Sequence, residues 1–271
     1  MTPKTHHPDN PRLEQMLKEW APQAHRQSDS PKLRLVTFPS AGASFSAFGR
    51  TFVNLPPGVE HCPIQYPGRM GHPAGRHHSS VQSLAREGVE VLAPLLNVPT
   101  AFVGYSLGGV VAFELAHALR AAGKPGPTNL FVISRSAPNT PSKRPWLHTL
   151  VGAQFQAGLE RRYGPISPIL KNEPELLKMF LAITQQDLAA SETYRNQNTQ
   201  PLNCDIHAWV GAKDTSLSVE VSQGWEAMTT GRFDLDVLPG GHFLLEGHSN
   251  AIGGAIAAKL AGDMKRNDNP Q

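Results

Sequence analysis

The chain has 271 residues, of which 39% are hydrophobic and 17% charged, and its formal net charge is +3. This length suits one large domain with a sizeable core, and no apolar run approaches the roughly 18–20 residues of a membrane span. Without an apolar signal segment or a basic stripe interleaved with aromatic residues, we expect a cytoplasmic protein that binds neither membranes nor nucleic acid.

The first 30 residues are polar and rich in proline. We predict a flexible N-terminal extension over residues 1–30, with one short helical possibility at 12–20. A single α/β domain is expected over residues 31–265, and residues 266–271 are expected to form a C-terminal tail.

Strands and helices alternate regularly through the expected domain. Strands are predicted at 33–38, 62–66, 100–103, 130–133, 206–210 and 233–238. Helices are predicted at 45–55, 81–96, 110–122, 219–228 and 248–261. This alternation predicts an α/β fold with a mostly parallel sheet covered by helices on both faces.

The alternation breaks between the strands predicted at 130–133 and 206–210. A structureless connection of that length is unusual within a compact domain. Helical stretches at about 147–163 and 174–196 fill it, joined by the proline-bearing segment 164–168. We therefore predict an inserted helical lid at about 138–200 rather than ordinary crossover helices.

Cysteine and histidine usage gives no sign of a metal site. Cys62 and Cys204 form neither a disulfide framework nor a metal-ligand spacing, and we interpret both as buried free thiols. Several histidines cluster at positions rich in proline and glycine, without helical or strand spacing: His6, His7, His72, His77 and His78. We expect no metal ion and no cofactor.

One six-residue segment, Gly104-Tyr105-Ser106-Leu107-Gly108-Gly109, joins a predicted strand to a predicted helix. Strand, Gly-x-Ser-x-Gly and helix make up the nucleophile elbow of α/β-hydrolases, where the glycines permit a sharp turn that exposes the serine hydroxyl. The alternative is a structural turn of the same sequence. The context favours Ser106 as a nucleophile, which then requires a base.

The acid partner of Ser106 follows from the chain order of these enzymes, which is serine, acid and then histidine. No aspartate lies between Ser106 and Asp187, so the acid cannot directly follow the strand predicted at 130–133 unless Asn139 or a distant glutamate substitutes. The candidates are Asp187, Asp205, Asp214, Asp234 and Asp236. Only Asp214 follows the carboxyl end of a predicted strand, where open α/β sheets carry their active-site loops. We predict Asp214 as the acid.

The base is predicted by the same rule. His242 follows the last strand through Pro239-Gly240-Gly241, whereas His248 is interpreted as a capping or surface residue. We expect His242 to take the Ser106 proton as the serine attacks a carbonyl. The resulting oxyanion needs backbone donors, one from Leu107 and one from the small-residue loop 39–43.

These motifs together resemble the type II thioesterases, the stand-alone editing hydrolases of non-ribosomal peptide and polyketide synthases. The resemblance covers about 33–261 and rests on Phe38-Pro39-Ser40-Ala41-Gly42-Ala43-Ser44, Gln65-Tyr66-Pro67-Gly68-Arg69, the elbow, Ser134-Arg135-Ser136-Ala137-Pro138, Glu192-Thr193-Tyr194, Gly211-Ala212-Lys213-Asp214 and Leu238-Pro239-Gly240-Gly241-His242-Phe243. It implies an α/β-hydrolase that cleaves acyl thioesters from the phosphopantetheine arm of acyl or peptidyl carrier proteins. We expect it to act as a monomer.

The chain departs from the family pattern near the nucleophile. Ser40 stands where the family commonly has His, and the usual elbow Gly-His-Ser-Met-Gly differs at Tyr105 and Leu107. Because these positions line or adjoin the nucleophile, Ser40 and Tyr105 are assigned to substrate binding. The resemblance implies that Ala41 partners Leu107 in the oxyanion hole.

Other functions use the same residues and stay open at this point, because a fold does not determine a function. A carboxylic esterase or lipase would use the same triad, as would an acyltransferase with an alcohol or amine acceptor. A non-catalytic hydrolase-fold protein that binds a carrier protein is the alternative from another class.

Overall fold

The computed structural model describes residues 11–23, 31–69, 78–140 and 144–268. Its described strands are β1 (Leu33–Phe38), β2 (Val59–Pro63), β3 (Thr100–Tyr105), β4 (Asn129–Ile133), β5 (Asp205–Gly211) and β6 (Phe233–Leu238). They form one sheet in the order β2-β1-β3-β4-β5-β6, and every neighbouring pair is parallel. The predicted α/β fold is therefore confirmed.

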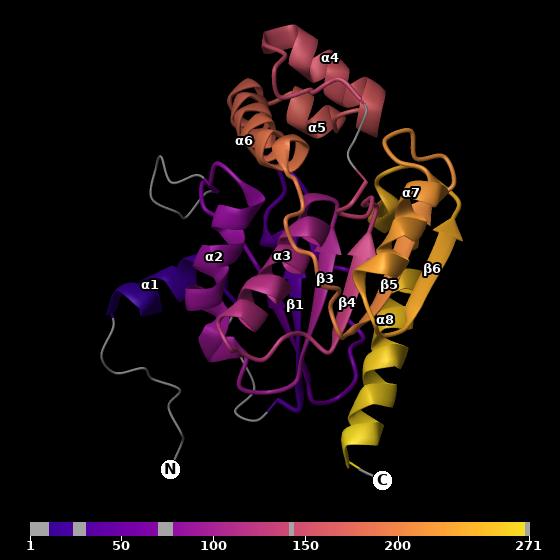
Figure 1. The fold of residues 1–271 in the computed structure, drawn as a ribbon. Helices are drawn as coiled ribbons and strands as arrows, with labels where there is room; N and C mark the ends of the chain where they lie inside the picture. The colour runs from indigo at the N-terminus through magenta and orange to yellow at the C-terminus, as the bar shows by residue number, and fades with distance from the viewer. Residues whose placement is uncertain (1–10, 24–30, 70–77, 141–143, 269–271) are drawn as a thin grey trace.

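Helices cover both faces of this sheet (Figure 1). One face carries α1 (Pro11–Trp20), α2 (Val81–Leu92), α3 (Leu107–Ala121), α7 (Val219–Gln223) and the 3-10 turns η3 (Ala93–Leu95) and η4 (Gly224–Met228). The other face carries η2 (Phe45–Phe48) and α8 (Leu244–Asp268). Each face of the sheet has its own hydrophobic core, and alternating strand residues point into one or the other. In β1, Val36 and Phe38 face α2 and α3, whereas Leu33 and Leu35 face α8.

The chain leaves the sheet between β4 and β5 and forms three helices (Figure 1). These are α4 (Gly152–Tyr163), α5 (Pro168–Lys171) and α6 (Pro174–Thr193), and we call them the helical insertion. They stand beyond the carboxyl ends of the strands and have a small core of their own, in which Phe155 and Leu159 of α4 meet Leu188 of α6. α5 lies in the segment that was expected only to join two helices.

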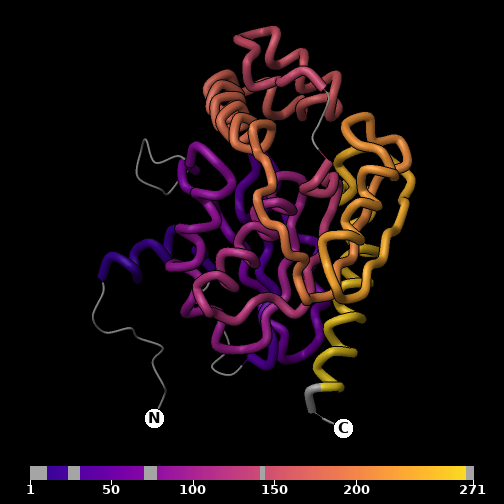
Figure 2. The backbone as a smooth tube through the Cα atoms, viewed as in Figure 1, coloured from indigo at the N-terminus to yellow at the C-terminus, as the bar shows by residue number. Residues whose placement is uncertain are grey.

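The return from α6 to β5 runs along α3 (Figure 2). Arg120 of α3 donates hydrogen bonds to the carbonyls of Gln200 and Pro201 in this segment. Tyr194, at its start, donates to the carboxylate of Glu114, also on α3. These hydrogen bonds attach the segment that follows the helical insertion to the sheet domain.

The short helix considered possible at 12–20 is present as α1, and this part of the expected extension is packed on the sheet domain. Residues of α1 pack on α2, with Met16 and Trp20 buried, and Trp20 Nε1 donates to Glu87 at 3.0 Å. The spacing of Met16 and Trp20 places both on one helical face, which the polar composition concealed. Residues 1–10 and 24–30 lie outside the described part of the chain.

Other boundaries shift for local reasons. The helix expected at 45–55 is a single 3-10 turn that ends before Gly49. β2 begins at Val59 and ends at Pro63, the limits of its residue-by-residue pairing with β1. α8 begins at Leu244, runs beyond residue 265 into the expected tail, and is kinked at His248, whose ring contacts the carbonyl of Pro239.

The structure also bears on the thiols, on metal binding and on membrane spans. Cys62 and Cys204 are buried and free, as predicted, and burial raises the pKa of each thiol to about 12. Within the described ranges, no group of three His, Cys, Asp or Glu side chains could hold a metal ion. His6, His7, His72 and His77 lie outside those ranges. None of the helices that the structure describes is long and apolar enough to cross a bilayer.

Candidate active site

The turn between β3 and α3 has the geometry of a nucleophile elbow. Ser106 has a φ of 52° and a ψ of −111°, a backbone conformation that costs a residue other than glycine about 1–3 kcal/mol. A Cβ at position 104 would lie 2.4 Å from the carbonyl oxygen of Gly108, and one at position 108 would lie 2.0 Å from that of Phe38. Glycine at both positions permits this close crossing and leaves the Ser106 hydroxyl at the start of α3.

Three side chains from distant segments meet at this edge of the sheet. His242, after β6, places Nε2 3.0 Å from Ser106 Oγ. Its Nδ1 lies 2.8 Å from Oδ2 of Asp214, which follows β5. An ionised carboxylate only accepts hydrogen bonds, so Nδ1 carries the ring proton and Nε2 is left to accept from the serine hydroxyl.

The Asp214 carboxylate is held in its ionised form. Its side chain is 0% exposed. Burial by itself raises the pKa of Asp214, but the hydrogen bond and charge of His242 and two bonds from Ser216 outweigh it and hold the pKa below its usual range. Those bonds run to Oδ1 from Ser216 N at 2.7 Å and from Ser216 Oγ at 2.6 Å. This carboxylate can therefore stabilise a charged imidazole.

Ser216 is a site residue that the sequence reasoning missed. Its hydroxyl also lies 2.9 Å from His242 Nδ1, so it contacts both the acid and the base. The available signal was local: a serine two residues after an aspartate commonly satisfies the carboxylate in a turn.

The backbone carbonyl of His242 accepts hydrogen bonds from two hydroxyl groups. Tyr105 donates at 3.1 Å and Ser134 at 2.8 Å. Ser134 has a φ of 52°, in the left-handed region that favours glycine. Tyr105 was expected to bind substrate, and this is corrected: its side chain points into the core beneath α8 and fixes the His242 loop. Strand alternation at the end of β3 turns it away from the open side.

Two backbone amides near the nucleophile are free to donate. Leu107 is the first residue of α3, so its N–H has no acceptor within the helix. In the part of the chain that is described, neither the Leu107 nor the Ala41 amide donates to another residue. The loop after β1 lies against the start of α3, because the carbonyls of Phe38 and Pro39 sit over Gly108. Both amides therefore fit the predicted oxyanion donors.

Three of the four other aspartates considered as the acid have other partners, and the fourth, Asp234, lies within β6. Asp187, in α6, pairs with Arg69. Asp205 pairs with Lys259 at 2.7 Å, and Asp236 pairs with His207 at 2.8 Å. These contacts leave Asp214 as the carboxylate that meets His242.

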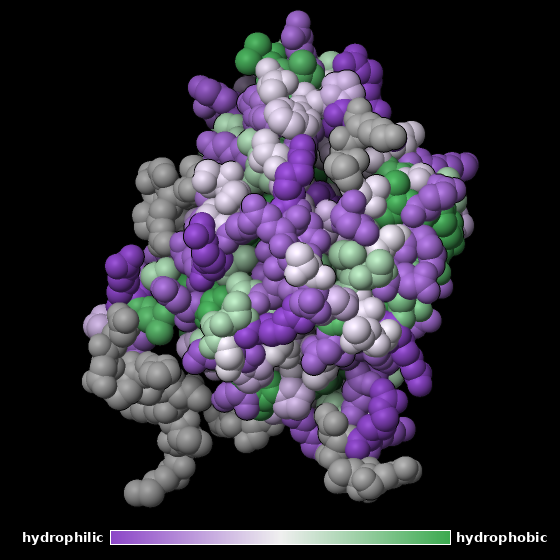
Figure 3. Space-filling model, in the orientation of Figure 1, coloured by the Kyte–Doolittle hydropathy of each residue, from purple (hydrophilic) through white to green (hydrophobic). Residues whose placement is uncertain are grey.

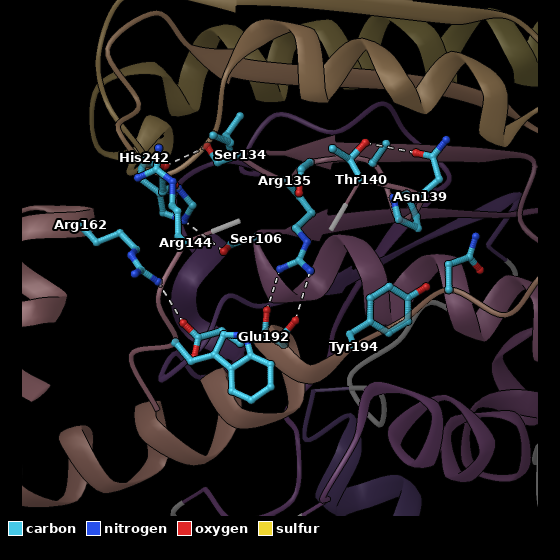
Figure 4. Close-up of a pocket in the computed structure, with 18 of the residues that line it drawn as sticks. Ser106, Ser134, Arg135, Asn139, Thr140, Arg144, Arg162, Glu192, Tyr194 and His242 are labelled. Atoms are coloured by element: carbon cyan, nitrogen blue, oxygen red, sulfur yellow. Dashed lines mark hydrogen bonds and ion pairs between the residues drawn. The ribbon is translucent and has the colours of Figure 1, made fainter. Parts of the chain in front are cut away.

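Two cavities meet at Ser106 and His242. The first, of about 380 Å³, is mostly polar, and its lining includes Ser134, Arg135, Asn139, Arg144, Arg162 and Glu192 (Figure 4). The second, of about 260 Å³, is mostly apolar, and its lining includes Ala41, Leu159, Ile166, Leu170, Phe180 and Leu188. Ser40 lines the apolar cavity, in keeping with its predicted place beside the substrate. Figure 3 shows that the face of the molecule between the helical insertion and the sheet is largely hydrophilic.

The polar cavity contains a guanidinium group that makes no direct ion pair with any described residue, although the charge of Glu192 acts on it. Arg162 is paired with Glu192 at 3.0 Å, but across the described ranges no carboxylate lies within ion-pair distance of Arg135. Arg135 donates to Ser191 Oγ at 2.6 Å, and its buried Nε has no hydrogen-bond partner. Burial lowers the pKa of Arg135 from its usual value. A ligand with acceptor atoms would complete this group.

Comparisons with known proteins show the family to which the chain belongs. A family model described as the thioesterase domain matches residues 33–260. The gramicidin S biosynthesis protein GrsT of Aneurinibacillus migulanus is 31% identical over 229 residues, covering 84% of this chain and 89% of GrsT.

Solved structures are similar over the same span. The RedJ thioesterase from the prodiginine pathway of Streptomyces coelicolor matches with a TM-score of 0.76 and 31% identity, over 85% of this chain and 89% of RedJ. The type II thioesterase BorB from the borrelidin cluster matches with a TM-score of 0.74 and 31% identity, over 84% of this chain and 91% of BorB.

Proposed function

The chain belongs to the type II thioesterases, and we propose that it hydrolyses acyl thioesters on the phosphopantetheine arm of carrier proteins, removing aberrant acyl groups from a non-ribosomal peptide or polyketide synthase. The observation that carries the proposal is the hydrogen-bonded series from Asp214 through His242 to Ser106, with distances of 2.8 and 3.0 Å. That series lies beside two amides that are free to donate.

The proposed reaction proceeds in two halves. Ser106 Oγ attacks the thioester carbonyl while His242 Nε2 takes its proton, and the tetrahedral oxyanion is held by the amides of Leu107 and Ala41. Collapse breaks the carbon–sulfur bond, and His242 returns the proton to the pantetheine thiolate. Water then attacks the acyl-Ser106 ester with His242 again as base, releasing the free acid. Asp214 stabilises the imidazolium that forms each time.

The two cavities support a substrate with an apolar half and a polar half. The apolar cavity, which contains Ser40 and Ala41 beside the nucleophile, suits the acyl group. The polar cavity, where Arg135 Nε is buried without a hydrogen-bond partner among the described residues, suits the amide groups of the pantetheine arm. The helical insertion contributes to both walls, in keeping with a lid over the substrate. A carrier protein is generally acidic, which the net charge of +3 permits.

A panel of acyl-carrier proteins tests the proposal. Wild-type enzyme should release free acid from short, branched and aminoacyl loads, and Ser106→Ala should release none. We expect short acyl groups to be preferred, because the apolar cavity holds only about 260 Å³. A profile that is uniform over chain length would contradict the preference.

The same panel separates the alternatives. Faster turnover of simple oxygen esters than of carrier thioesters would indicate an esterase. Capture of the acyl group by an added alcohol or amine in preference to water would indicate an acyltransferase. Full biological function of a folded Ser106→Ala protein would indicate a non-catalytic carrier-binding protein.

A further inference from the structure

A single carboxylate connects the helical insertion to the loop that follows β1. Oδ2 of Asp187, on α6, accepts a hydrogen bond from Gly42 N at 2.7 Å and another from Arg69 Nη2. Gly42 has a φ of +74°, and a Cβ at this position would lie 2.1 Å from Oγ1 of Thr184, also on α6. The helix therefore lies directly on the loop, and Gly42 is the residue next to the proposed oxyanion donor Ala41.

The motif Gln65-Tyr66-Pro67-Gly68-Arg69 holds the same loop from its other side. Arg69 Nε donates to the carbonyl of Ala43 at 3.0 Å. The Tyr66 hydroxyl donates to the carbonyl of Pro39 at 3.2 Å. The catalytic steps leave this motif without a role, yet its side chains bond to the loop on both sides of Ala41. We call Arg69, Asp187 and the bond to Gly42 N the loop latch.

The latch consists of buried charges. The side chains of Arg69 and Asp187 are 4% and 12% exposed. Removing two charges from water costs about as much as their attraction returns, so a buried ion pair is weak evidence for a purely stabilising role. What this pair does provide is direction, since one carboxylate oxygen fixes both the Gly42 amide and the guanidinium that holds Ala43.

We propose that Asp187 and Arg69 are positioning residues that aim the Ala41 amide at the oxyanion, so that docking of the helical insertion and assembly of the oxyanion hole are one event. The inference rests on the proposed function, because it takes Ala41 as an oxyanion donor. If α6 lifts, the Gly42 N–H loses its acceptor, so the Ala41–Gly42 peptide is no longer fixed by the helix. The adjoining Ser40–Ala41 peptide, which carries the Ala41 N–H, then keeps its bond from Ala43 N at 3.1 Å but loses this support from the neighbouring peptide. Hydrolysis then occurs only while α6 is docked on the loop.

Substitution of Asp187 should affect the rate of hydrolysis but not the binding of substrate. Asp187→Leu should lower kcat by about 10²-fold, the order expected when one oxyanion donor is lost. KM should change less than about threefold. The loss should be the same for short and long acyl groups, because every substrate uses the oxyanion hole. A loss confined to long acyl groups would mean that Asp187 only shapes the apolar cavity, and would overturn the proposal.

A matched control is the buried pair Arg34–Glu60, which joins β1 to β2 at 2.8 Å, with side chains 6% and 7% exposed. Glu60→Leu should reduce thermal stability as Asp187→Leu does but leave kcat unchanged. The double variant Arg69→Met/Asp187→Leu removes both charges and should regain stability without regaining rate. Recovery of rate together with stability would overturn the proposal.

A transition-state analogue gives a readout that a structural role would not move. An alkyl boronic acid adds to Ser106 and places an oxygen in the oxyanion hole, whereas a thioether analogue of acyl pantetheine does not. Asp187→Leu should weaken boronate binding by the same factor as kcat/KM and leave the thioether Kd unchanged. Equal weakening of both ligands would reject the latch. Hydrolysis by Ser106→Ala would instead reject the proposed function, so the two failures are distinguishable.

Discussion

The two cavities that meet at Ser106 share a nucleophile and a base, but their walls have opposite character. The polar cavity is built largely from the segment after β4 and the carboxyl end of α6, and it contains Arg135, whose buried Nε has no hydrogen-bond partner in the described part of the chain. The apolar cavity is built from α4, α5, the middle of α6 and the loop after β1. This difference teaches that the site is organised for an asymmetric substrate whose halves are recognised by separate elements. Substitutions in one wall should therefore affect one half of the substrate.

The largest effect should come from the centre that both cavities share. Asp214→Asn removes the acceptor that sets the His242 tautomer and should lower kcat by about 10⁴-fold. The factor should be the same for every acyl group and for thioesters with or without a pantetheine arm. Steady-state rates over such a panel check this, with thermal unfolding as the control for folding. A loss that depends on the substrate would mean that Asp214 also shapes a cavity.

The second-largest effect should come from a substitution in the wall of the polar cavity. Arg135→Met removes the buried guanidinium and should raise KM about tenfold for pantetheine thioesters, the order of one lost hydrogen bond to a charged group. Simple alkyl thioesters that lack the arm should be hydrolysed as before. A parallel change in both substrate series would break the assignment of this cavity to the arm.

A substitution in the wall of the apolar cavity should change the preference for acyl chain length, by a smaller factor. Phe180→Ala enlarges the apolar cavity and should shift the ratio of kcat/KM for long over short acyl groups upward by about fivefold, within the range for a few methylenes in an apolar pocket. Leu176→Ala, on the exposed side of the same helix, is the control and should leave the ratio unchanged. An unchanged ratio in Phe180→Ala would remove the acyl group from this cavity.

The smallest effect should come from the support of His242. Tyr105→Phe removes one of the two hydroxyls on the His242 carbonyl, and Ser134 keeps the other. We expect a two- to threefold lower kcat, equal for all substrates, and a loss of about 1 kcal/mol of stability. Urea unfolding measures the stability. A change in KM alone would return Tyr105 to the substrate-binding role that the sequence suggested.

Position along the chain was enough to locate much of this arrangement. Ser106, Asp214 and His242 each follow a strand, and parallel strands bring their carboxyl ends to one edge. The elbow has its own sequence signature because only glycine fits the close crossing at positions 104 and 108.

For the other residues the sequence offers at most a motif or a turn signal, and the contacts that they make are set by the fold. Ser216 and Ser134 act through single hydroxyls whose partners are set by loop geometry. Arg69 and Asp187 are far apart in the chain, and the ordinary composition around Asp187 suggests only a helix. The buried face of α1 was missed because two large side chains, Met16 and Trp20, lie in a polar segment.

The central claim is that Ser106 carries the acyl group during hydrolysis, and acid quenching of a single turnover with an acyl-carrier protein tests it most directly. Mass mapping of the quenched enzyme should find the acyl mass on the peptide that contains Ser106, decaying as free acid appears. Release of free acid at the same rate by Ser106→Ala, with no acyl mass on that peptide in the wild-type enzyme, would contradict the account.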